Sequence, residues 1–211
     1  MRVDADRSEP ARATACGSVL GAPAASRVVR ATHLVRACHL SLDDPIIDVT
    51  GVDSDLMEVL LGEGYRDLTV VESSESGYAD LLRRCAGHLD RVNIVKADLA
   101  GFHATRRYAL WHDAGMFHTL IYPEERRQYL EALEEALRPE GYLVIGTFGP
   151  EGPEELGGRL VCRYSSASLA LELGSHFELA EHSLSVHHST SGQHQQYLHC
   201  RFRRHAPTRA A

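Results

Sequence analysis

The segment from Trp111 to His118, with the sequence WHDAGMFH, concentrates side chains that can move protons. Histidine has the side chain whose ordinary pKa lies nearest neutral pH, and a neighbouring carboxylate can fix which ring nitrogen carries the proton. His112 and His118 are therefore candidates for a general base or for orienting a nucleophile, and Asp113 for fixing the tautomer. The alternative is structural: Trp111 packs beneath a helix, and His118 caps or hydrogen-bonds the next loop.

The segment PIIDVTGVDSDL, residues 45–56, has the form of a strand and tight turn that hold a cofactor in α/β domains. An apolar run leads into Asp48, and Gly51 lies within the turn. Glycines let the backbone pass close to a ligand, and such turns usually contain several of them. Thr50 and Val52 flank the single glycine here, so the sequence raises the question of whether this turn still holds a cofactor.

The histidines and cysteines do not follow a metal-binding pattern. The chain has 13 histidines and five cysteines, without the C-x-x-C spacing of zinc or redox sites. In an expected C-terminal hairpin, alternation places His187 and His199 on the outward face, but no carboxylate or cysteine converges there. We therefore expect a solvated or partner-facing hairpin, no metal site, and cysteines that are buried or unreactive thiols.

Length and charge exclude several functional classes. A chain of 211 residues is expected to form one domain with its own hydrophobic core. The net charge of −7 argues against a broad nucleic-acid surface, which needs clustered lysine and arginine. No apolar stretch is long enough for a membrane span or a signal peptide, so we expect a cytoplasmic protein that acts on a small molecule without contacting a membrane.

Alternating apolar patterns predict the elements that position these residues. We expect strands at 43–49, 68–73, 92–98, 108–113 and 142–148, and helices from residue 23, after Asp53 or Ser54, and at 77–89, 123–137 and around 168–173. Two alternating runs, 177–187 and 195–204, predict an antiparallel pair. Leu184 and Val186 would then share a face with Leu198, Cys200 and Phe202.

These elements predict an α/β fold, with a mostly parallel sheet, helices on both faces and a C-terminal antiparallel strand pair. The expected domain spans residues 23–205. Residues 1–22 lack an apolar period and are expected to form a flexible or partner-ordered arm, and residues 206–211 a disordered tail.

Four stretches carry a resemblance to a known family: LWHDAGMFH, LRPEGYLVIGTFGPEGP, VCRYSSASLALELGSHFEL and YLHCRFRR. They resemble class I S-adenosylmethionine-dependent methyltransferases, and more narrowly the small bacterial proteins in which WHD and FH are followed by LRPGG, ATFGPEGP and a terminal YCRF. The resemblance runs from about Leu40 to Arg204. It implies a single Rossmann-like domain with a seven-stranded sheet.

The resemblance also implies cofactor contacts. Glu72 would accept hydrogen bonds from the ribose hydroxyls, and Asp98 would face the adenine amino group with Leu99 beside the ring. Asp48 would orient the first loop, in which Gly51 approaches the methionine part of the cofactor. Each acidic residue at the end of a strand has a plainer reading as a cap or a solvated loop residue.

Departures from the family pattern concentrate at the expected pocket. Where the family reads D-V-G-G-G-x-S, Thr50 and Val52 introduce β-branched side chains, which are strained at positive φ. Asp53 and Asp55 add negative charge near the expected cofactor carboxylate. Other changes are the loss of an upstream SWYQ segment, LGGRL in place of CSGL, and alanine at 109 and 114 in place of an acidic residue and an arginine.

These departures lead to a primary hypothesis and two rivals. The first is a methyltransferase-fold protein of bacterial specialised metabolism that binds no cofactor. It would act as a subunit of a heteromeric enzyme, as a homodimer, or in a non-methylating reaction such as elimination or ring closure. The second is an active S-adenosylmethionine-dependent methyltransferase whose acceptor is deprotonated by His112 or His118. The third is a purely structural binding module.

Overall fold

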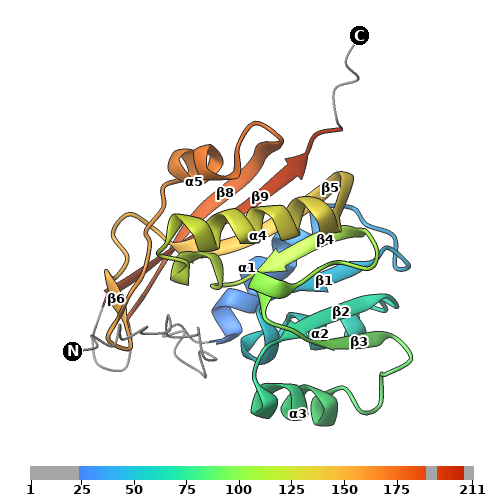
Figure 1. The fold of residues 1–211 in the computed structure, drawn as a ribbon. Coiled ribbons are helices and arrows are strands. Elements are labelled where there is room, and N and C mark those ends of the chain that lie inside the picture. Colours follow the sequence, from blue (N-terminus) through green and yellow to red (C-terminus); the bar gives the residue numbers. More distant parts are fainter. Residues whose placement is uncertain (1–23, 189–193, 207–211) are drawn as a thin grey trace, which may run out of the picture.

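The computed structural model describes residues 24–188 and 194–206, in which helices cover both faces of a seven-stranded sheet (Figure 1). The helices are α1 (Ala24–Arg36), α2 (Leu56–Gly62), α3 (Glu75–Arg84), α4 (Pro123–Ala136) and α5 (Ser166–Leu173). The strands of this sheet are β1 (Ile46–Asp48), β2 (Leu68–Glu72), β3 (Val92–Lys96), β4 (Tyr108–Asp113), β5 (Leu137–Phe148), β8 (Phe177–His188) and β9 (His194–Arg204). The short 3-10 helices are η1 (Gly51–Asp53), η2 (Leu99–Gly101) and η3 (Phe117–Thr119), and β6 (Glu155–Leu156) pairs with β7 (Arg159–Leu160) in a separate ribbon.

The strands lie in the order β3-β2-β1-β4-β5-β9-β8. The neighbours from β3 to β5 are parallel, and β9 runs antiparallel to both β5 and β8. The predicted parallel sheet with a C-terminal antiparallel pair is therefore confirmed. The strand order reverses between β1 and β4, and ligands of open α/β sheets bind beyond the carboxyl ends of the strands at such a point.

Alternate residues of the central strands face two separate apolar cores. Ile46 packs with residues of α1, α2 and α3, whereas Ile47 packs with residues of α4 and α5. Both isoleucines are fully buried, as expected for a parallel strand that is covered on both faces. The sheet thus carries α1 on the same face as α2 and α3, and this placement determines what covers the carboxyl end of β4.

Several element bounds differ from the predicted ones for local reasons. β5 begins at Leu137 rather than at Tyr142, because Leu137 already pairs with Tyr108 before an irregularity in which Glu140 has a φ of 60°. α3 begins at Glu75 because the Ser74 hydroxyl accepts a hydrogen bond from Gly77 N. The N-cap of α2 is Asp55, not Asp53 or Ser54.

The hairpin pairs as predicted but is less buried. Leu184 lies opposite Leu198, yet Leu184 and Val186 are 52% and 48% exposed, because β8 is the edge strand and α5 covers only part of the hairpin. Val29, an apolar residue of α1, is also exposed.

The expected N-terminal arm, residues 1–22, lies outside the described residues, as do residues 207–211 of the expected tail and most of the predicted hairpin turn. Among the described helices, none is long and apolar enough to cross a membrane.

Candidate functional site

A groove of about 220 Å³ lies beyond the carboxyl ends of β1 and β2, beside the loop that follows β4. Its walls combine apolar side chains, hydroxyl groups and two carboxylates. The lining residues are Val49, Thr50, Val52, Asp53, Val71, Glu72, Ser73, Ser74, Ser76, Gly77, Gly115, Met116 and Thr119. This is the place at which the sequence predicts the cofactor.

In the turn after β1, Gly51 occupies the position whose left-handed backbone conformation requires glycine. Gly51 has a φ of 71°, and a Cβ atom there would overlap the Glu72 carboxylate. Thr50 has ordinary helical angles, φ −72° and ψ −23°, and Val52 is not among the described residues with positive φ. The strain expected at Thr50 and Val52 is therefore absent, because the left-handed position of the turn falls between them.

Glu72 holds this turn in place through its carboxylate. Val52 N donates to Oε2 at 2.9 Å, and Ser74 N and Ser74 Oγ each donate to Oε1 at 2.7 Å. The side chain is almost fully buried at 7% exposure. A carboxylate offers about four acceptor positions, so most of the capacity expected for ribose hydroxyls is already used within the protein.

Thr50 joins the turn after β1 to the turn after β4. Its hydroxyl Oγ1 accepts a hydrogen bond from Ala114 N at 2.8 Å, and its own N–H donates to Asp48 Oδ1 at 2.9 Å. Glycine at this position could make only the second of these bonds. The threonine side chain thus adds a cross-link between the two loops that a glycine at this position could not form.

Arg84 of α3 fixes the far side of the same turn. Its guanidinium donates to Val52 O at 2.8 Å and to Ser54 O at 3.2 Å, and it forms an ion pair with Asp55 at 3.2 Å. Part of the negative charge expected to oppose a cofactor carboxylate is therefore paired with an arginine.

His112 lies beside Asp48, with which it is paired across β1 and β4. The ring atom Nδ1 is 3.1 Å from Asp48 Oδ1, within ion-pair distance but poorly aligned for a hydrogen bond, and both side chains are at most 2% exposed. Burial raises the pKa of Asp48, but the charge of His112 and hydrogen bonds to the carboxylate outweigh burial and lower it. The ionised Asp48 therefore favours the tautomer of His112 with its proton on Nδ1.

Asp113 has a different role from the one expected. Its carboxylate accepts hydrogen bonds from the backbone N–H groups of Gly115, Met116 and Phe117 at 2.6 to 3.0 Å, and so shapes the turn after β4. Burial raises the pKa of Asp113, and the hydrogen bonds from the backbone and Tyr129 only partly offset this rise. Asp48, rather than Asp113, is the carboxylate that orients His112.

The structure does not bring the other predicted residues to the groove or to His112. His118 is fully buried and packs against Phe148, with 4.3 Å between the ring centroids. Asp98 is exposed, and Leu99 is buried in the core on the side of α4. Ala109, one of the departures from the family pattern, lies at the start of β4, at the opposite end from the groove.

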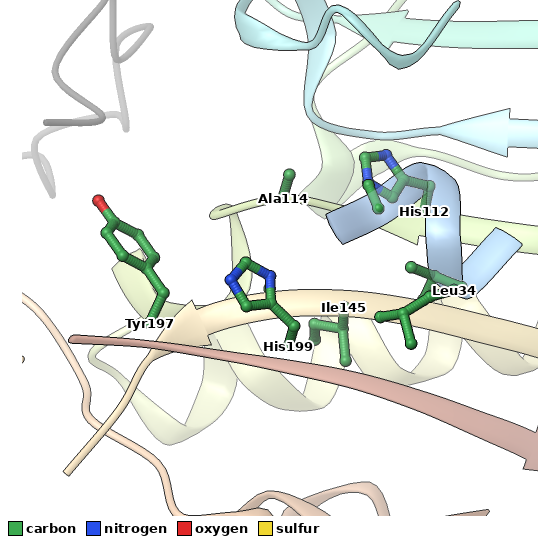
Figure 2. A pocket seen from close by; sticks show the side chains of 9 residues that line it. Leu34, His112, Ala114, Ile145, Tyr197 and His199 are labelled. Carbon is green, nitrogen blue, oxygen red and sulfur yellow. The ribbon is translucent and has the colours of Figure 1, made fainter. Parts of the chain in front are cut away.

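A small cavity of about 10 Å³ lies between α1 and the sheet, on the other side of Ala114 (Figure 2). Apolar residues of α1 and β5 line it together with His112, His199 and Tyr197. The complete lining is Ala31, Leu34, His112, Ala114, Val144, Ile145, Gly146, Tyr197 and His199. A second space of similar size adjoins it and shares Ala31, His112 and Ala114.

The position of His199, a residue of this cavity, differs from the predicted outward position. It is 6% exposed instead of facing outward, and it lies opposite Ser183 rather than His187. Its Nε2 is 2.9 Å from Ser185 Oγ. The alternation of β9 places Tyr197 and His199 on one face, but the helix that covers this face is at the other end of the chain.

Among the described residues, neither a metal cluster nor the thiols of Cys38 and Cys200 provide a reactive site. No group of three or more histidine, cysteine, aspartate or glutamate side chains in the described part of the chain is arranged to hold a metal ion. Burial raises the pKa of the Cys38 and Cys200 thiols to about 12, so these two cysteines are not thiolate nucleophiles at neutral pH.

Comparison with known proteins identifies the fold. No family model matches the chain, and no curated protein matches it in sequence. The structure is similar to that of Burkholderia thailandensis 1,6-didemethyltoxoflavin-N1-methyltransferase with bound 1,6-didemethyltoxoflavin and S-adenosylhomocysteine. The TM-score is 0.67 at 21% identity, over 86% of this chain and 79% of that one.

Two further structures give the same result. N-methyltransferase NodS from Bradyrhizobium japonicum WM9 has a TM-score of 0.66 at 18% identity, over 84% of this chain and 96% of that one. A protein described in the conversion of a disulfide bond into a thioacetal group during echinomycin biosynthesis has a TM-score of 0.65 at 18% identity, over 84% and 82%. The chain thus has the fold of class I S-adenosylmethionine-dependent methyltransferases.

Proposed function

We propose that this methyltransferase-fold protein no longer transfers methyl groups from S-adenosylmethionine, and that it catalyses a non-methylating reaction such as an elimination or ring closure in bacterial specialised metabolism. The observation that carries the proposal is the hydrogen bond of 2.8 Å from Ala114 N to Thr50 Oγ1. Thr50 lines the groove and Ala114 lines the cavity, so this bond lies where the two spaces meet.

Methyl transfer requires the donor and the acceptor to be in contact and aligned. A donor in the groove would have to reach past the Thr50 side chain to meet an acceptor held at His112. Glycine at position 50 would have no side chain between the two spaces, whereas the threonine side chain is held there by its hydrogen bond from Ala114 N. The hydrogen bond between Thr50 and Ala114 therefore favours a reaction that takes place at His112 alone, without a donor in the groove.

The residues of the groove also fit the nucleoside part of the cofactor poorly. Glu72, the residue expected to bind the ribose, uses its carboxylate to accept from Val52 N and from the N–H and hydroxyl of Ser74. Binding two ribose hydroxyls would require breaking some of these bonds, which fix the turn itself. Breaking the bond from Val52 N or from Ser74 N would leave a backbone donor unsatisfied at a cost of about 1 to 3 kcal/mol.

The chemistry that remains is that of His112. With Asp48 beside Nδ1, the opposite nitrogen Nε2 carries the lone pair and can accept a proton. A base positioned by a buried carboxylate is sufficient for an elimination or a ring closure that needs proton removal and substrate positioning. Two of the similar structures concern toxoflavin-type and echinomycin chemistry, and these support the assignment to specialised metabolism.

A second form of the proposal makes the chain a subunit of a heteromeric biosynthetic enzyme, or of a homodimer, whose other subunit contributes to the reaction. Purification of the full chain from its own host, followed by native mass spectrometry, tests this form. Copurification with a second biosynthetic protein in a fixed ratio is expected if the subunit form is right, and a monomer that is active alone would contradict it.

Calorimetry with S-adenosylhomocysteine tests the loss of methyl transfer. We expect the full chain to show no micromolar binding, and the Thr50→Gly/Val52→Gly double variant to bind at least about tenfold more tightly, a gain of about 1.4 kcal/mol. Ser76→Ala, which also changes the groove but not the turn, is the matched control and should leave the affinity unchanged. Micromolar binding by the unmodified chain would overturn the proposal.

An active methyltransferase is the alternative, and one observation favours it. The groove still has a volume of about 220 Å³ at the place of the cofactor, with Glu72 at its edge and Gly51 at the left-handed position of the turn. If the chain is an active methyltransferase, it should bind S-adenosylhomocysteine at micromolar concentration, and the two glycine substitutions should change the affinity little.

A further inference from the structure

The strand β8 forms one edge of the seven-stranded sheet, beyond β9 (Figure 1). It is 12 residues long and, in the described part of the chain, pairs with β9 alone. The opposite edge, β3, has only five residues, and its last residue Lys96 forms an ion pair with Glu75. Backbone N–H and C=O groups along the outer side of an edge strand can pair with another strand. The long edge at β8 therefore offers the larger surface for such pairing.

The second half of β8 lacks the features that protect sheet edges, which are charged side chains, prolines and bulges. The register shift of β8 lies in its first half, between Leu179 and Glu181, and residues 182–188 contain no aspartate, glutamate, lysine, arginine or proline. Leu184 and Val186 are 52% and 48% exposed, on a face that α5 covers only in part. An uncharged segment with two exposed apolar side chains thus lies where a further strand can pair.

The sequence of this segment is complementary to itself when two copies run antiparallel. Residues 183–187 read SLSVH, in which an apolar residue lies on each side of Ser185 and a polar residue lies beyond each apolar one. With Ser185 opposite Ser185 of a second copy, Leu184 lies opposite Val186 of that copy, and the two-fold axis generates the reverse pair. Residues directly opposite one another share a face of the sheet, so the four apolar side chains meet in one cluster.

Charge permits contact between two copies at this segment. The chain has a net charge of −7, so two copies repel one another wherever acidic surfaces meet. Glu181, the acidic residue nearest to the segment, is paired within the chain, because Arg201 Nη2 is 3.3 Å and His33 Nε2 is 3.2 Å from its carboxylate. Pairing over residues 183–187 therefore brings together no unpaired acidic charge of β8.

We propose that this protein forms a two-fold symmetric homodimer through antiparallel pairing of β8 with β8 of a second copy, centred on Ser185. The two seven-stranded sheets then continue as one sheet. Pairing of so few residues buries less surface than the roughly 1,200 to 2,000 Å² of a stable interface, so we expect a weak dimer that forms as the concentration rises. The inference concerns assembly and goes beyond the proposed reaction, to whose homodimer form it gives an interface.

Analytical ultracentrifugation of the full chain up to millimolar concentration tests the proposal. We expect the average mass to rise from that of the monomer toward that of the dimer and no further. Leu184→Lys, which places a charge in the apolar cluster twice per dimer, should weaken the dimer at least about tenfold. Leu89→Lys, the same change at a leucine that is 53% exposed beside the opposite edge of the sheet, is the matched control and should leave the dimer unchanged.

Paired cysteines test the register. Leu184→Cys and Val186→Cys are mixed in equal amounts and oxidised, and the unmodified chain gives the background from its own five cysteines. We expect more disulfide-linked dimer from the mixture than from either variant alone, because only the mixture places two introduced cysteines directly opposite each other.

Three results would overturn the proposal: a monomer at every concentration, equal weakening by Leu89→Lys, or equal cross-linking in the mixture and the separate variants. Pairing of β8 with residues 1–22 of its own chain, or with a different protein, would give the first of these results. Binding of S-adenosylhomocysteine is measured separately, so failure of the dimer is distinguishable from failure of the proposed function.

Discussion

The groove at Glu72 and the cavity at His112 meet at the Thr50–Ala114 hydrogen bond, and they differ in where their polar groups are directed. In the groove, the Glu72 carboxylate accepts from Val52 and Ser74, so its hydrogen bonds hold the protein's own turn together. In the cavity, the partners Asp48 and Ser185 sit behind the histidine rings. Both rings line the cavity.

This difference is what the proposed function expects of a scaffold that keeps a site while changing its use. Polar groups that hydrogen-bond to one another stabilise the fold. Polar groups that partner side chains hold in one orientation are instead positioned for a ligand. Substitution of Gly51 in the groove-side turn should therefore cost the most stability, and substitution of Ser185 behind the cavity the least. Five variants test this contrast, from the largest expected effect on stability to the smallest.

Gly51→Ala should have the largest effect. The residue has a φ of 71°, and its Cβ would overlap the Glu72 carboxylate, so we expect the free energy of unfolding to fall by about 3 kcal/mol. Urea denaturation measures this change. Gly62→Ala, at the end of α2 with no atom near the added Cβ, is the control and should be neutral or slightly stabilising. Equal losses in both variants would refute the role assigned to Gly51.

Asp48→Asn should have a smaller and pH-dependent effect. The pKa of Asp48 is lowered in the folded state, so its carboxylate contributes stability above its ordinary pKa, and this contribution is lost as the pH falls through the folded pKa. We expect a loss of about 2 kcal/mol at neutral pH. Denaturation at several pH values should show the difference from the unmodified chain shrinking below about pH 4.

Asp113→Asn gives the contrasting pH dependence. The pKa of Asp113 is raised by burial, so its ionisation at neutral pH opposes folding, and the unmodified chain regains this stability as the pH falls toward the folded pKa of Asp113. The stability of the unmodified chain relative to Asp113→Asn should therefore rise on acidification. The same direction of change for both aspartates would contradict the roles assigned to them.

Thr50→Val should lower the free energy of unfolding by about 1 kcal/mol, because it keeps the shape of the side chain but removes the acceptor of the Ala114 N–H bond. Val52→Thr, the reverse exchange two residues on, should be close to neutral. If Thr50→Val leaves stability unchanged in thermal and urea denaturation, the bond between the two turns is not a structural cross-link.

Ser185→Ala should have the smallest effect, about 0.5 kcal/mol, because it removes one hydrogen bond to His199 on a partly exposed edge strand. Differential scanning calorimetry measures the shift in melting temperature. A loss as large as that of Gly51→Ala would mean that the cavity side is as structural as the groove side, and the contrast between the two regions would fail.

The sequence predicted the scaffold well because its signals are local. Apolar runs that end in Asp48 and Glu72 gave the first two strands, and the segment from Tyr108 to Asp113 is a strand with the predicted bounds. The role of Asp113 could also have been corrected from the sequence. Adjacent residues of a strand point to opposite faces, so Asp113 could not orient His112.

Other parts of the site depend on contacts that a sequence does not reveal. Thr50 and Val52 replace family glycines, but only the structure shows that the left-handed position of the turn is Gly51. His112 lies in β4 and His199 in β9, far apart in the sequence. The helix α1, which covers His199, precedes both strands. A cavity formed by such distant segments has no periodic or motif signature.

The hydrogen bonds from Arg84 that fix the turn after β1 have a consequence for the amount of folded protein in a cell. A protein whose binding loop is closed by its ligand gains stability in proportion to the logarithm of the ligand concentration, so its abundance follows the supply of that ligand. Here Arg84, Glu72 and Ala114 close the loop with bonds from within the chain. If the chain binds no S-adenosylmethionine, as proposed, the amount of folded protein should be independent of the nutritional state that sets the cell's level of this cofactor.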